Sequence, residues 1–250
     1  MRRLGILIVI LAALAPGLAH AYIPPASFIV GKLAEKRAAL NLSEIEVFME
    51  TGYGASEPVV EKLLLKRPQR MRWSRVEGES EWAYIYKDGE AAEVSSKGEV
   101  KRAKVEFEPI VEVLIPKAQA QDPMRDEYLA LMRRLQIDPQ SVSLARFASR
   151  VAYVIGASAK DRDRHQLWID KDSFQPVRVM FRGEYQGKKG MWDYQFREFG
   201  ARETGDAFPR VIERLFDGKV VSHSEVEKVQ AGVKLPEASF QLPGVGSKAK

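Results

Sequence analysis

The segment HQLWIDKDSFQPVRVMF, residues 165–181, holds two apolar runs separated by a short polar stretch. Each run is rich in β-branched and aromatic side chains, which is typical of strands, and the polar residues between them favour a turn. The pair Asp170 and Asp172 also suggests a metal or phosphoryl site. A calcium loop, however, needs Gly and Glu at positions that hold Gln175 and Phe181 here. No helix follows the acids, as a phosphoryl-transfer site would require, so the segment predicts a hairpin.

This hairpin is one of a series of strand-like segments along the chain. Most of them end at a Gly-containing turn, and Asp88-Gly89 and Asp217-Gly218 predict tight hairpins because Gly accepts a positive φ. Helical segments are too few to connect parallel strands, so an antiparallel sheet is expected. The predicted strands are 44–52, 58–66, 70–78, 81–89, 90–98, 150–158, 165–171, 175–183, 190–199, 209–218 and 219–229.

Other segments favour helices. Apolar residues recur every three to four positions in 24–41 and again in 122–137, where Asp122-Pro123 is a typical helix start. A shorter helix is expected after Pro139, with Leu144 and Phe147 on its inner side. Residues 109–117 fit either a strand or a helix. The chain is therefore predicted to be α+β, with one strongly curved antiparallel sheet and helices on one side of it.

The N-terminal residues predict export. Arg2 and Arg3 precede an uncharged run, and the small-residue pattern Ala19-His20-Ala21 follows it, which is typical of a secretory signal peptide cleaved after Ala21. A permanent membrane anchor is the alternative, but the run is shorter than a spanning helix needs. The chain has no Cys, which excludes disulfides, thiolate metal sites and a lipidated N-terminal Cys. We expect a signal peptide at 1–21, one domain at 22–243, a flexible tail at 244–250 and a periplasmic location in a Gram-negative cell.

Charge and chemistry exclude several function classes. The chain has 39 Lys and Arg against 34 Asp and Glu, and cleavage removes two arginines, so the net charge falls from +5 to +3. This near balance argues against nucleic acid as a partner. After cleavage only His165 and His223 remain, without further ligands at metal-binding spacing, and the common catalytic motifs are absent. We therefore predict no catalytic residues, no metal, no cofactor and no enzyme activity.

Aromatic and aliphatic side chains occupy single faces of several strands. Because successive side chains point to opposite faces of a sheet, one face is predicted to be apolar and the other solvent-exposed. The apolar face is either a core closed by the helices or a cavity suited to acyl chains, and the pattern leaves both open. Strand alternation alone predicts these ligand-binding residues: Trp73, Trp82, Tyr84, Tyr86, Val177, Val179, Phe181, Trp192, Tyr194 and Phe196.

Two motifs and the order of elements carry a family resemblance. LWIDKDSFQPVRVMF (167–181) and the closing VKLPEASFQLP (233–243) resemble the LolA/LolB-like superfamily of periplasmic lipoprotein carriers, as does the order helix, meander, helical insertion, meander. The resemblance covers residues 22–243. It implies an unclosed half-barrel of about eleven antiparallel strands, with helices covering the concave face as a lid over an apolar cavity.

The resemblance also implies a function. It is that of a monomeric periplasmic binding protein, carrier or chaperone, which shelters the acyl chains of lipoproteins or other lipids during sorting toward the outer membrane. Its further partners would be inner- and outer-membrane transport proteins. The alternative on the same scaffold is an envelope-stress sensor that regulates a membrane protein.

Overall fold

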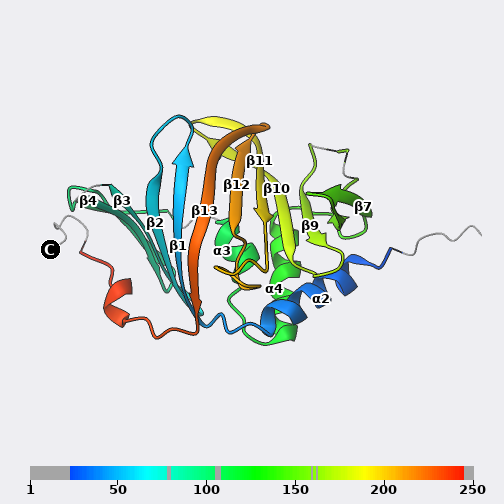
Figure 1. The fold of residues 1–250 in the computed structure, drawn as a ribbon, viewed down its shortest axis with the longest axis horizontal. Helices are drawn as coiled ribbons and strands as arrows, with labels where there is room; N and C mark the ends of the chain where they lie inside the picture. Colours follow the sequence, from blue (N-terminus) through cyan, green and yellow to red (C-terminus); the bar gives the residue numbers. More distant parts are fainter. Residues whose placement is uncertain (1–22, 78–79, 105–107, 159, 162, 245–250) are drawn as a thin grey trace, which may run out of the picture.

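One antiparallel sheet forms the frame of the molecule (Figure 1). The computed structural model describes residues 23–244 except 78–79, 105–107, 159 and 162, so the predicted signal peptide and nearly all of the predicted tail lie outside the described residues. The strands are β1 (Glu44–Tyr53), β2 (Val59–Lys66), β3 (Arg70–Glu77), β4 (Ser80–Lys87), β5 (Glu90–Val94), β6 (Val100–Arg102), β7 (Val142–Phe147), β8 (Arg150–Ile155), β9 (Gln166–Asp170), β10 (Pro176–Tyr185), β11 (Lys188–Arg197), β12 (Val211–Phe216) and β13 (Lys219–Ala231). The helical segments are α2 (Ala26–Ala38), α3 (Pro109–Leu114), α4 (Gln121–Arg134) and the 3-10 turn η1 (Glu237–Phe240).

The sheet consists of two meanders joined at one seam. Its strand order is β6-β5-β4-β3-β2-β1-β13-β12-β11-β10-β9-β8-β7, so β1 pairs with β13 in the middle while β6 and β7 form the two edges. The predicted hairpins are present, with positive φ at Asp88 and Gly89 and at Asp217 and Gly218. The described part of the chain holds 13 strands instead of the eleven expected. The predicted fold class, an unclosed antiparallel half-barrel with helices on one face, is confirmed.

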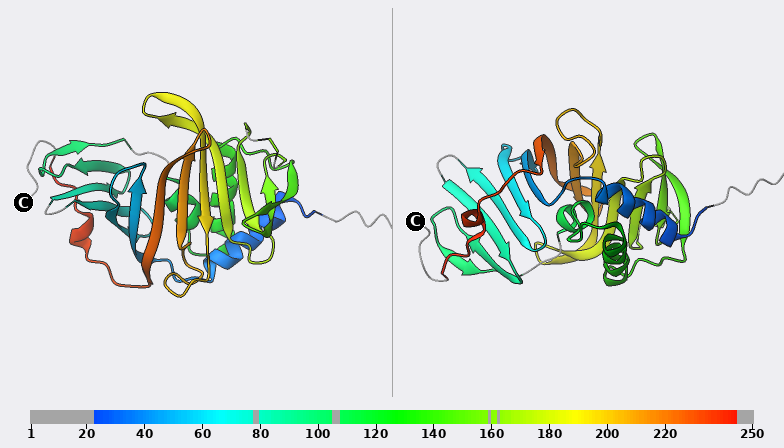
Figure 2. Two further views of the ribbon diagram at one scale, coloured as in Figure 1. Left: turned by 45° about the horizontal axis from the view of Figure 1, so that its top comes forward. Right: turned by 90° about the horizontal axis from the view of Figure 1, so that it is seen from below.

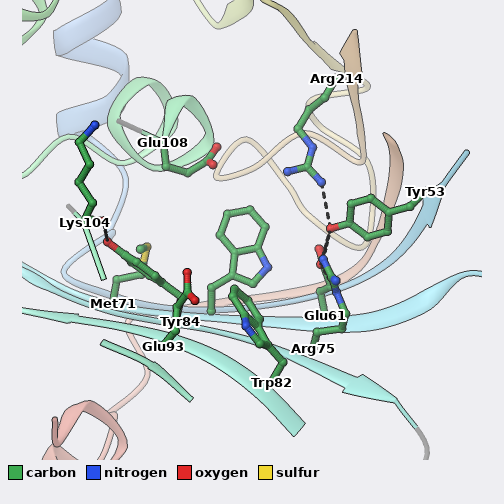
Figure 3. Close-up of a pocket in the computed structure, with 11 residues that line it drawn as sticks. Tyr53, Glu61, Met71, Arg75, Trp82, Tyr84, Glu93, Lys104, Glu108 and Arg214 are labelled. Atoms are coloured by element: carbon green, nitrogen blue, oxygen red, sulfur yellow. Dashed lines mark hydrogen bonds and ion pairs between the residues drawn. The ribbon is translucent and has the colours of Figure 1, made fainter. Parts of the chain in front are cut away.

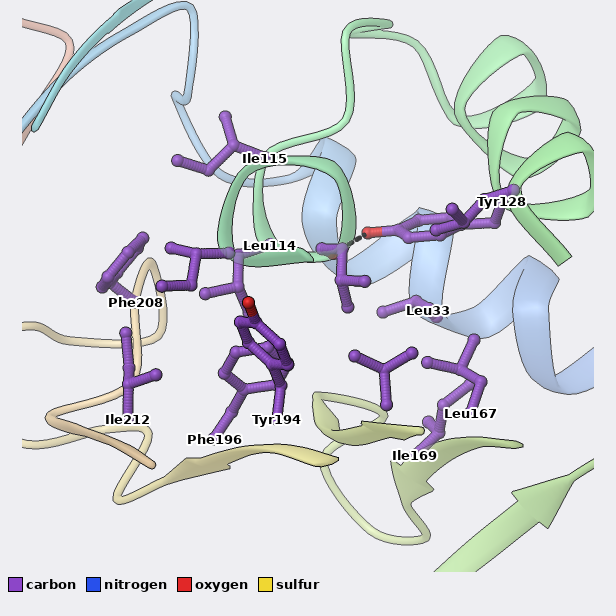
Figure 4. Close-up of a cluster of buried hydrophobic side chains, with 14 of the residues drawn as sticks. Leu33, Leu114, Ile115, Tyr128, Leu167, Ile169, Tyr194, Phe196, Phe208 and Ile212 are labelled. Atoms are coloured by element: carbon purple, nitrogen blue, oxygen red, sulfur yellow. Dashed lines mark hydrogen bonds between the residues drawn. The ribbon is translucent and has the colours of Figure 1, made fainter. Parts of the chain in front are cut away.

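The helices lie on the concave side of the sheet, beneath its C-terminal half (Figures 1 and 2). Leu33 of α2, Leu114 of α3 and Tyr128 of α4 pack with Tyr194 and Phe196 of β11 in one core cluster (Figure 4). The Tyr128 hydroxyl donates to the backbone oxygen of Val113 at 2.9 Å, which ties α4 to α3. No helix in the described part of the chain is long and apolar enough to cross a bilayer.

The convex side of the N-terminal half is covered by the C-terminal segment. Phe240 of η1 is fully buried there against Leu64 and Leu235. Glu237 of the same turn forms ion pairs with Lys66 and Arg70 on the sheet. The closing segment 233–243 thus packs on the face opposite to the helices.

The prediction of a short helix after Pro139 is wrong. Residues Val142–Phe147 form the edge strand β7, whose partners run from Val142 opposite Ile155 to Phe147 opposite Arg150. Leu144 and Phe147 are three residues apart, which is one face of a helix but opposite faces of a strand. The ambiguous segment forms α3, with Pro109 at its first position and the Glu108 side chain accepting from Ile110 N at 3.1 Å.

The hairpin at 165–181 is present, and the Asp170 carboxylate shapes its turn. Asp170 Oδ1 accepts hydrogen bonds from the backbone nitrogens of Asp172 and Ser173 at 3.2 and 2.8 Å and from the Ser173 hydroxyl at 2.7 Å. Arg150 lies 2.9 Å from the other carboxylate oxygen. The carboxylate therefore shapes a turn, as predicted. Within the described residues, no group of three or more His, Asp or Glu is placed to hold a metal ion.

Candidate functional site

Two adjoining cavities open between α3 and the concave side of β2–β4. The larger has a volume of about 350 Å³ and the smaller about 100 Å³. Met71, Tyr84 and Glu108 line both cavities, so we treat the two as one site and call it the α3 cleft. Its three parts are the cleft floor (Met71, Trp73, Trp82, Tyr84, Tyr86), the polar end (Tyr53, Glu61, Arg75, Arg214) and the α3 rim (Arg67, Val111, Glu112, Ile115, Lys117).

The cleft floor follows from the register of two neighbouring strands. Trp73 of β3 lies opposite Tyr84 of β4, and Met71 lies opposite Tyr86. Directly opposed residues project from the same face, so the strand register places these four side chains on one face of the sheet. The result is an apolar strip that runs from the polar end to the α3 rim.

The polar end is a closed hydrogen-bond network. The Tyr53 hydroxyl donates to Glu61 Oε1 at 2.6 Å and accepts from Arg75 Nη2 at 2.7 Å and from Arg214 Nη2 at 3.1 Å. Glu61 is only 1% exposed and also accepts from the Thr51 hydroxyl at 3.0 Å. The buried carboxylate is thus fully engaged by fixed donors. This end of the cleft is a rigid polar wall (Figure 3).

Burial shifts the pKa values of the groups in this wall. It raises the pKa of the Tyr53 hydroxyl above its usual value, so Tyr53 stays neutral and continues to donate. Burial opposes the charge of Arg214, but the neighbouring Tyr53 and Glu108 outweigh it, and the pKa of Arg214 is raised. Desolvation raises the pKa of Glu108, which lies where the two cavities meet. Burial and the neighbouring side chains thus determine the protonation states of these groups.

The α3 rim contains an incompletely paired arginine. Arg67 follows β2, and its Nη1 donates to the backbone oxygen of Ala118 at 2.8 Å. Its Nε and Nη2 atoms are buried and have no hydrogen-bond partner among the residues that the structure describes. Burial lowers the pKa of Arg67.

The chemistry of the cleft is that of a binding site. The described residues that line it include no His, Ser or Thr, and the Tyr53 hydroxyl beside the Glu61 carboxylate is also held by Arg75 and Arg214. What the cleft offers is aromatic surface, one rigid polar end and a cationic rim. Such a surface suits a molecule with an apolar and a polar part.

Four of the ten predicted ligand-binding residues line the cleft, namely Trp73, Trp82, Tyr84 and Tyr86. Another five lie in or against the core cluster beneath the helices, outside both cavities: Val179, Phe181, Trp192, Tyr194 and Phe196. The concave face is therefore filled beneath α2 and α4 and open beside α3. Contact of these residues with a ligand stays a prediction.

Val177 does not share a face with Val179 and Phe181, as alternation predicted. It packs with Trp168 and Val154 in a separate cluster on the convex side. The pairing of β10 with β9 shifts register between Pro176 and Arg178. A bulge inserts one extra residue and reverses the alternation before it, which explains the error.

The sequence also missed the polar parts of the cleft. Glu61 carries a usable signal, since it shares a strand face with Leu63 and Leu65 and a charge among apolar residues marks a buried polar site. Arg214 carries none, because it reaches Tyr53 only through the pairing of β1 with β13 and of β13 with β12. Arg67 lies in a turn, where an arginine is unremarkable in sequence.

Comparisons with known proteins identify solved structures with a similar fold. No family model and no curated protein matches the sequence. Among solved structures, the LolA superfamily protein NE2245 from Nitrosomonas europaea matches with a TM-score of 0.52 and 16% identity, over 88% of this chain and 98% of that one. A domain proposed to be an outer membrane lipoprotein-sorting protein, from Vibrio parahaemolyticus, matches with a TM-score of 0.50 and 12% identity, over 84% of this chain and 95% of that one.

Proposed function

Because the chain has the LolA-like fold of these two structures, we propose that it is a periplasmic carrier that binds lipids or lipoproteins during transfer toward the outer membrane. The observation that carries the proposal is the α3 cleft, an aromatic strip left open on a concave face that is otherwise filled. In this proposal the signal peptide is removed after Ala21, and membrane transport proteins load and unload the carrier. The role is binding, without a catalytic step.

The cleft fits one apolar chain. Burial of each methylene contributes about 0.8 kcal/mol, so a chain laid along the cleft floor is held without directional bonds. The larger cavity, about 350 Å³, is at the low end of the range of about 300–1,000 Å³ typical of small-molecule sites. We therefore expect one acyl chain in this form of the protein, and a ligand with several chains requires α3 to move.

Native mass spectrometry of the protein purified from its own periplasm tests the proposal. We expect co-purifying acyl species and uptake of an added synthetic lipopeptide. The Trp82→Ala variant removes a ring from the cleft floor and should weaken uptake. Trp192→Ala is the matched control, because Trp192 is a half-buried Trp of the same sheet that packs on Tyr185 and Phe216 outside the cleft.

A bare protein mass together with no uptake of lipopeptide contradicts the carrier proposal. Equal losses in both variants contradict the cleft as the site. Capture of an inner-membrane regulator by a lipid-free protein would instead support the envelope-stress sensor.

A further inference from the structure

We infer that the α3 cleft binds an amphiphile whose acyl chain is joined to its head by an amide, with the amide N–H bound by Glu108 and the amide carbonyl by Arg214. The inference rests on the proposed carrier function and names the ligand class of the same cleft. It starts from two side chains of opposite charge that line the larger cavity and form no ion pair with each other.

Two hydrogen bonds hold the Arg214 guanidinium and leave one nitrogen open. Its Nε donates to the Ser222 hydroxyl, and its Nη2 donates to the Tyr53 hydroxyl at 3.1 Å. Nη1 has no hydrogen-bond partner within the described residues, and Figure 3 shows this end of the side chain directed into the cavity. The buried unpaired atoms of the described chain include Nε and Nη2 of Arg67 but not Nη1 of Arg214. A ligand oxygen can therefore reach Nη1.

Glu108 presents an open acceptor across the same cavity. Its Oε1 accepts from Ile110 N at 3.1 Å, which caps α3 and fixes the side chain. Oε2 has no partner in the part of the chain that the structure describes, and it is not among the buried unpaired atoms either. Figure 3 shows the carboxylate directed toward Arg214, above the cleft floor.

The two side chains influence each other without meeting. Burial raises the pKa of Glu108, and the charge of Arg214 opposes this shift. Burial also opposes the charge of Arg214, and Tyr53 and Glu108 together outweigh it. An acceptor on α3 and a donor on β12 thus face each other across the cavity, with room between them for a polar group of a ligand.

An amide matches this pair of groups better than the other common acyl linkages. A trans amide is planar and directs its N–H and its carbonyl to opposite sides of the chain. One of these groups can donate to Glu108 while the other accepts from Arg214. An ester lacks the donor, and a carboxylate would bring a like charge toward Glu108. Polar groups in a desolvated site need partners, so the amide is the linkage that satisfies both side chains.

The other two acids of the cavity already have partners. Glu61 lies 3.2 Å from Arg75, and Glu93 lies 2.6 Å from Lys101. Neither requires a donor from a ligand.

The acyl chain has a continuous apolar path from this point. Met71 and Tyr84 line both cavities beside Glu108. Val111 and Ile115 of the α3 segment supply further apolar surface in the smaller cavity. A chain attached to the amide can therefore lie along the cleft floor toward the α3 rim.

Binding of N-decanoylethanolamine and of 2-hydroxyethyl decanoate to the full chain, measured by titration calorimetry, tests the inference. The two probes share chain and head and differ only in the amide or ester linkage. We expect the amide to bind at least about 10-fold more tightly, because the ester leaves Glu108 Oε2 without a donor. Work at about pH 8.5 favours the ionised carboxylate, which is the form that accepts from the amide.

The Glu108→Gln variant should lose this preference. Glutamine keeps an oxygen for Ile110 N but replaces the second oxygen by a donor, which no longer accepts from the amide. Glu93→Gln is the matched control, because it changes an acid of the same cavity that is paired with Lys101, and the preference should persist. If Glu108→Gln does not fold, the N-methylated amide replaces it as a probe of the wild-type protein. That probe has no N–H and should bind no more tightly than the ester.

The possible results separate the two proposals. Equal binding of amide and ester overturns the amide assignment and leaves the carrier proposal intact. No binding of either probe contradicts both. Decanoate that binds more tightly than the amide overturns the assignment in favour of an anion at Arg214.

An N-decanoyl tetrapeptide distinguishes the two sources of such an amide. Tighter binding of this probe than of N-decanoylethanolamine supports an acylated peptide as the ligand. Equal binding supports recognition of the amide alone, as in a free fatty amide. Weaker binding of the tetrapeptide than of 2-hydroxyethyl decanoate overturns the amide as the recognised group.

Discussion

The two halves of the concave face are built from the same alternating strands but end in different states. In the C-terminal half, Val179 and Phe196 are 0% exposed beneath the helices. In the N-terminal half, Trp82 and Tyr84 stay half-buried and line a cavity. The helices explain the contrast, because α2, α3 and α4 pack on the C-terminal half, whereas α3 only borders the cavity on the N-terminal half. An apolar strand face thus becomes core where helices cover it and cleft where they do not.

The largest effect is expected where the face is filled. Phe196→Ala leaves a cavity in a closed core and should lower the free energy of unfolding by about 3–5 kcal/mol, measured by denaturant titration. Trp82→Ala, on the open half, removes a ring that is only half-buried and should cost less than about 1.5 kcal/mol. Similar losses in the two variants would break the distinction between core and cleft.

A second variant tests the boundary between the halves. Arg37 of α2 is fully buried and donates to the backbone oxygens of Leu114, Asp206 and Ala207. Burial lowers its pKa to about 10, so it remains charged at neutral pH. Arg37→Ala leaves these acceptors without a donor and should lower the free energy of unfolding by about 2–4 kcal/mol.

Lys36→Ala provides the control for Arg37→Ala. Lys36 is the exposed neighbour on the same helix and should change stability by less than about 0.5 kcal/mol in the same titration. If Arg37→Ala also lowers the free energy of unfolding by less than about 0.5 kcal/mol, Arg37 does not hold α2 against the end of α3.

The smallest effect is expected at Glu108, on the open half. Burial raises the pKa of Glu108, so the folded chain binds its proton more tightly than the unfolded chain does. The contribution of this group to stability is therefore present below the unfolded pKa and is lost as pH rises through the folded pKa. Glu108→Gln should flatten this part of the pH dependence in melting curves between pH 4 and 8. If the Glu108→Gln variant keeps the wild-type pH dependence of stability, other titrating groups cause it.

The parts of the fold that depend on a local sequence pattern could be predicted. The hairpin at 165–181 was predictable because strand alternation and turn-forming acids lie next to each other in the chain. The edge strand β7 was not, since Leu144 and Phe147 have a spacing that also suits a helix.

The cleft was predictable only in part. Alternation placed Trp82, Tyr84 and Tyr86 on one face, and the structure brings them to the cleft floor. Alternation assigned Val177 to the wrong face of the sheet, because the sequence pattern does not reveal the bulge in β10. The meeting of Arg214 with Tyr53 depends on strand pairing across the whole chain, which no local signal encodes.

The seam between β1 and β13 has a consequence for how the molecule assembles. Ile45 pairs with Ala231, so the central pair of strands joins segments near opposite ends of the described chain. Each meander can form hairpins locally and early, but the seam must wait until β13 exists and must close a long loop of chain, which slows folding. During synthesis the two meanders would therefore pass through a stage in which β1 is an unpaired edge, open to wrong partners until the last strand arrives.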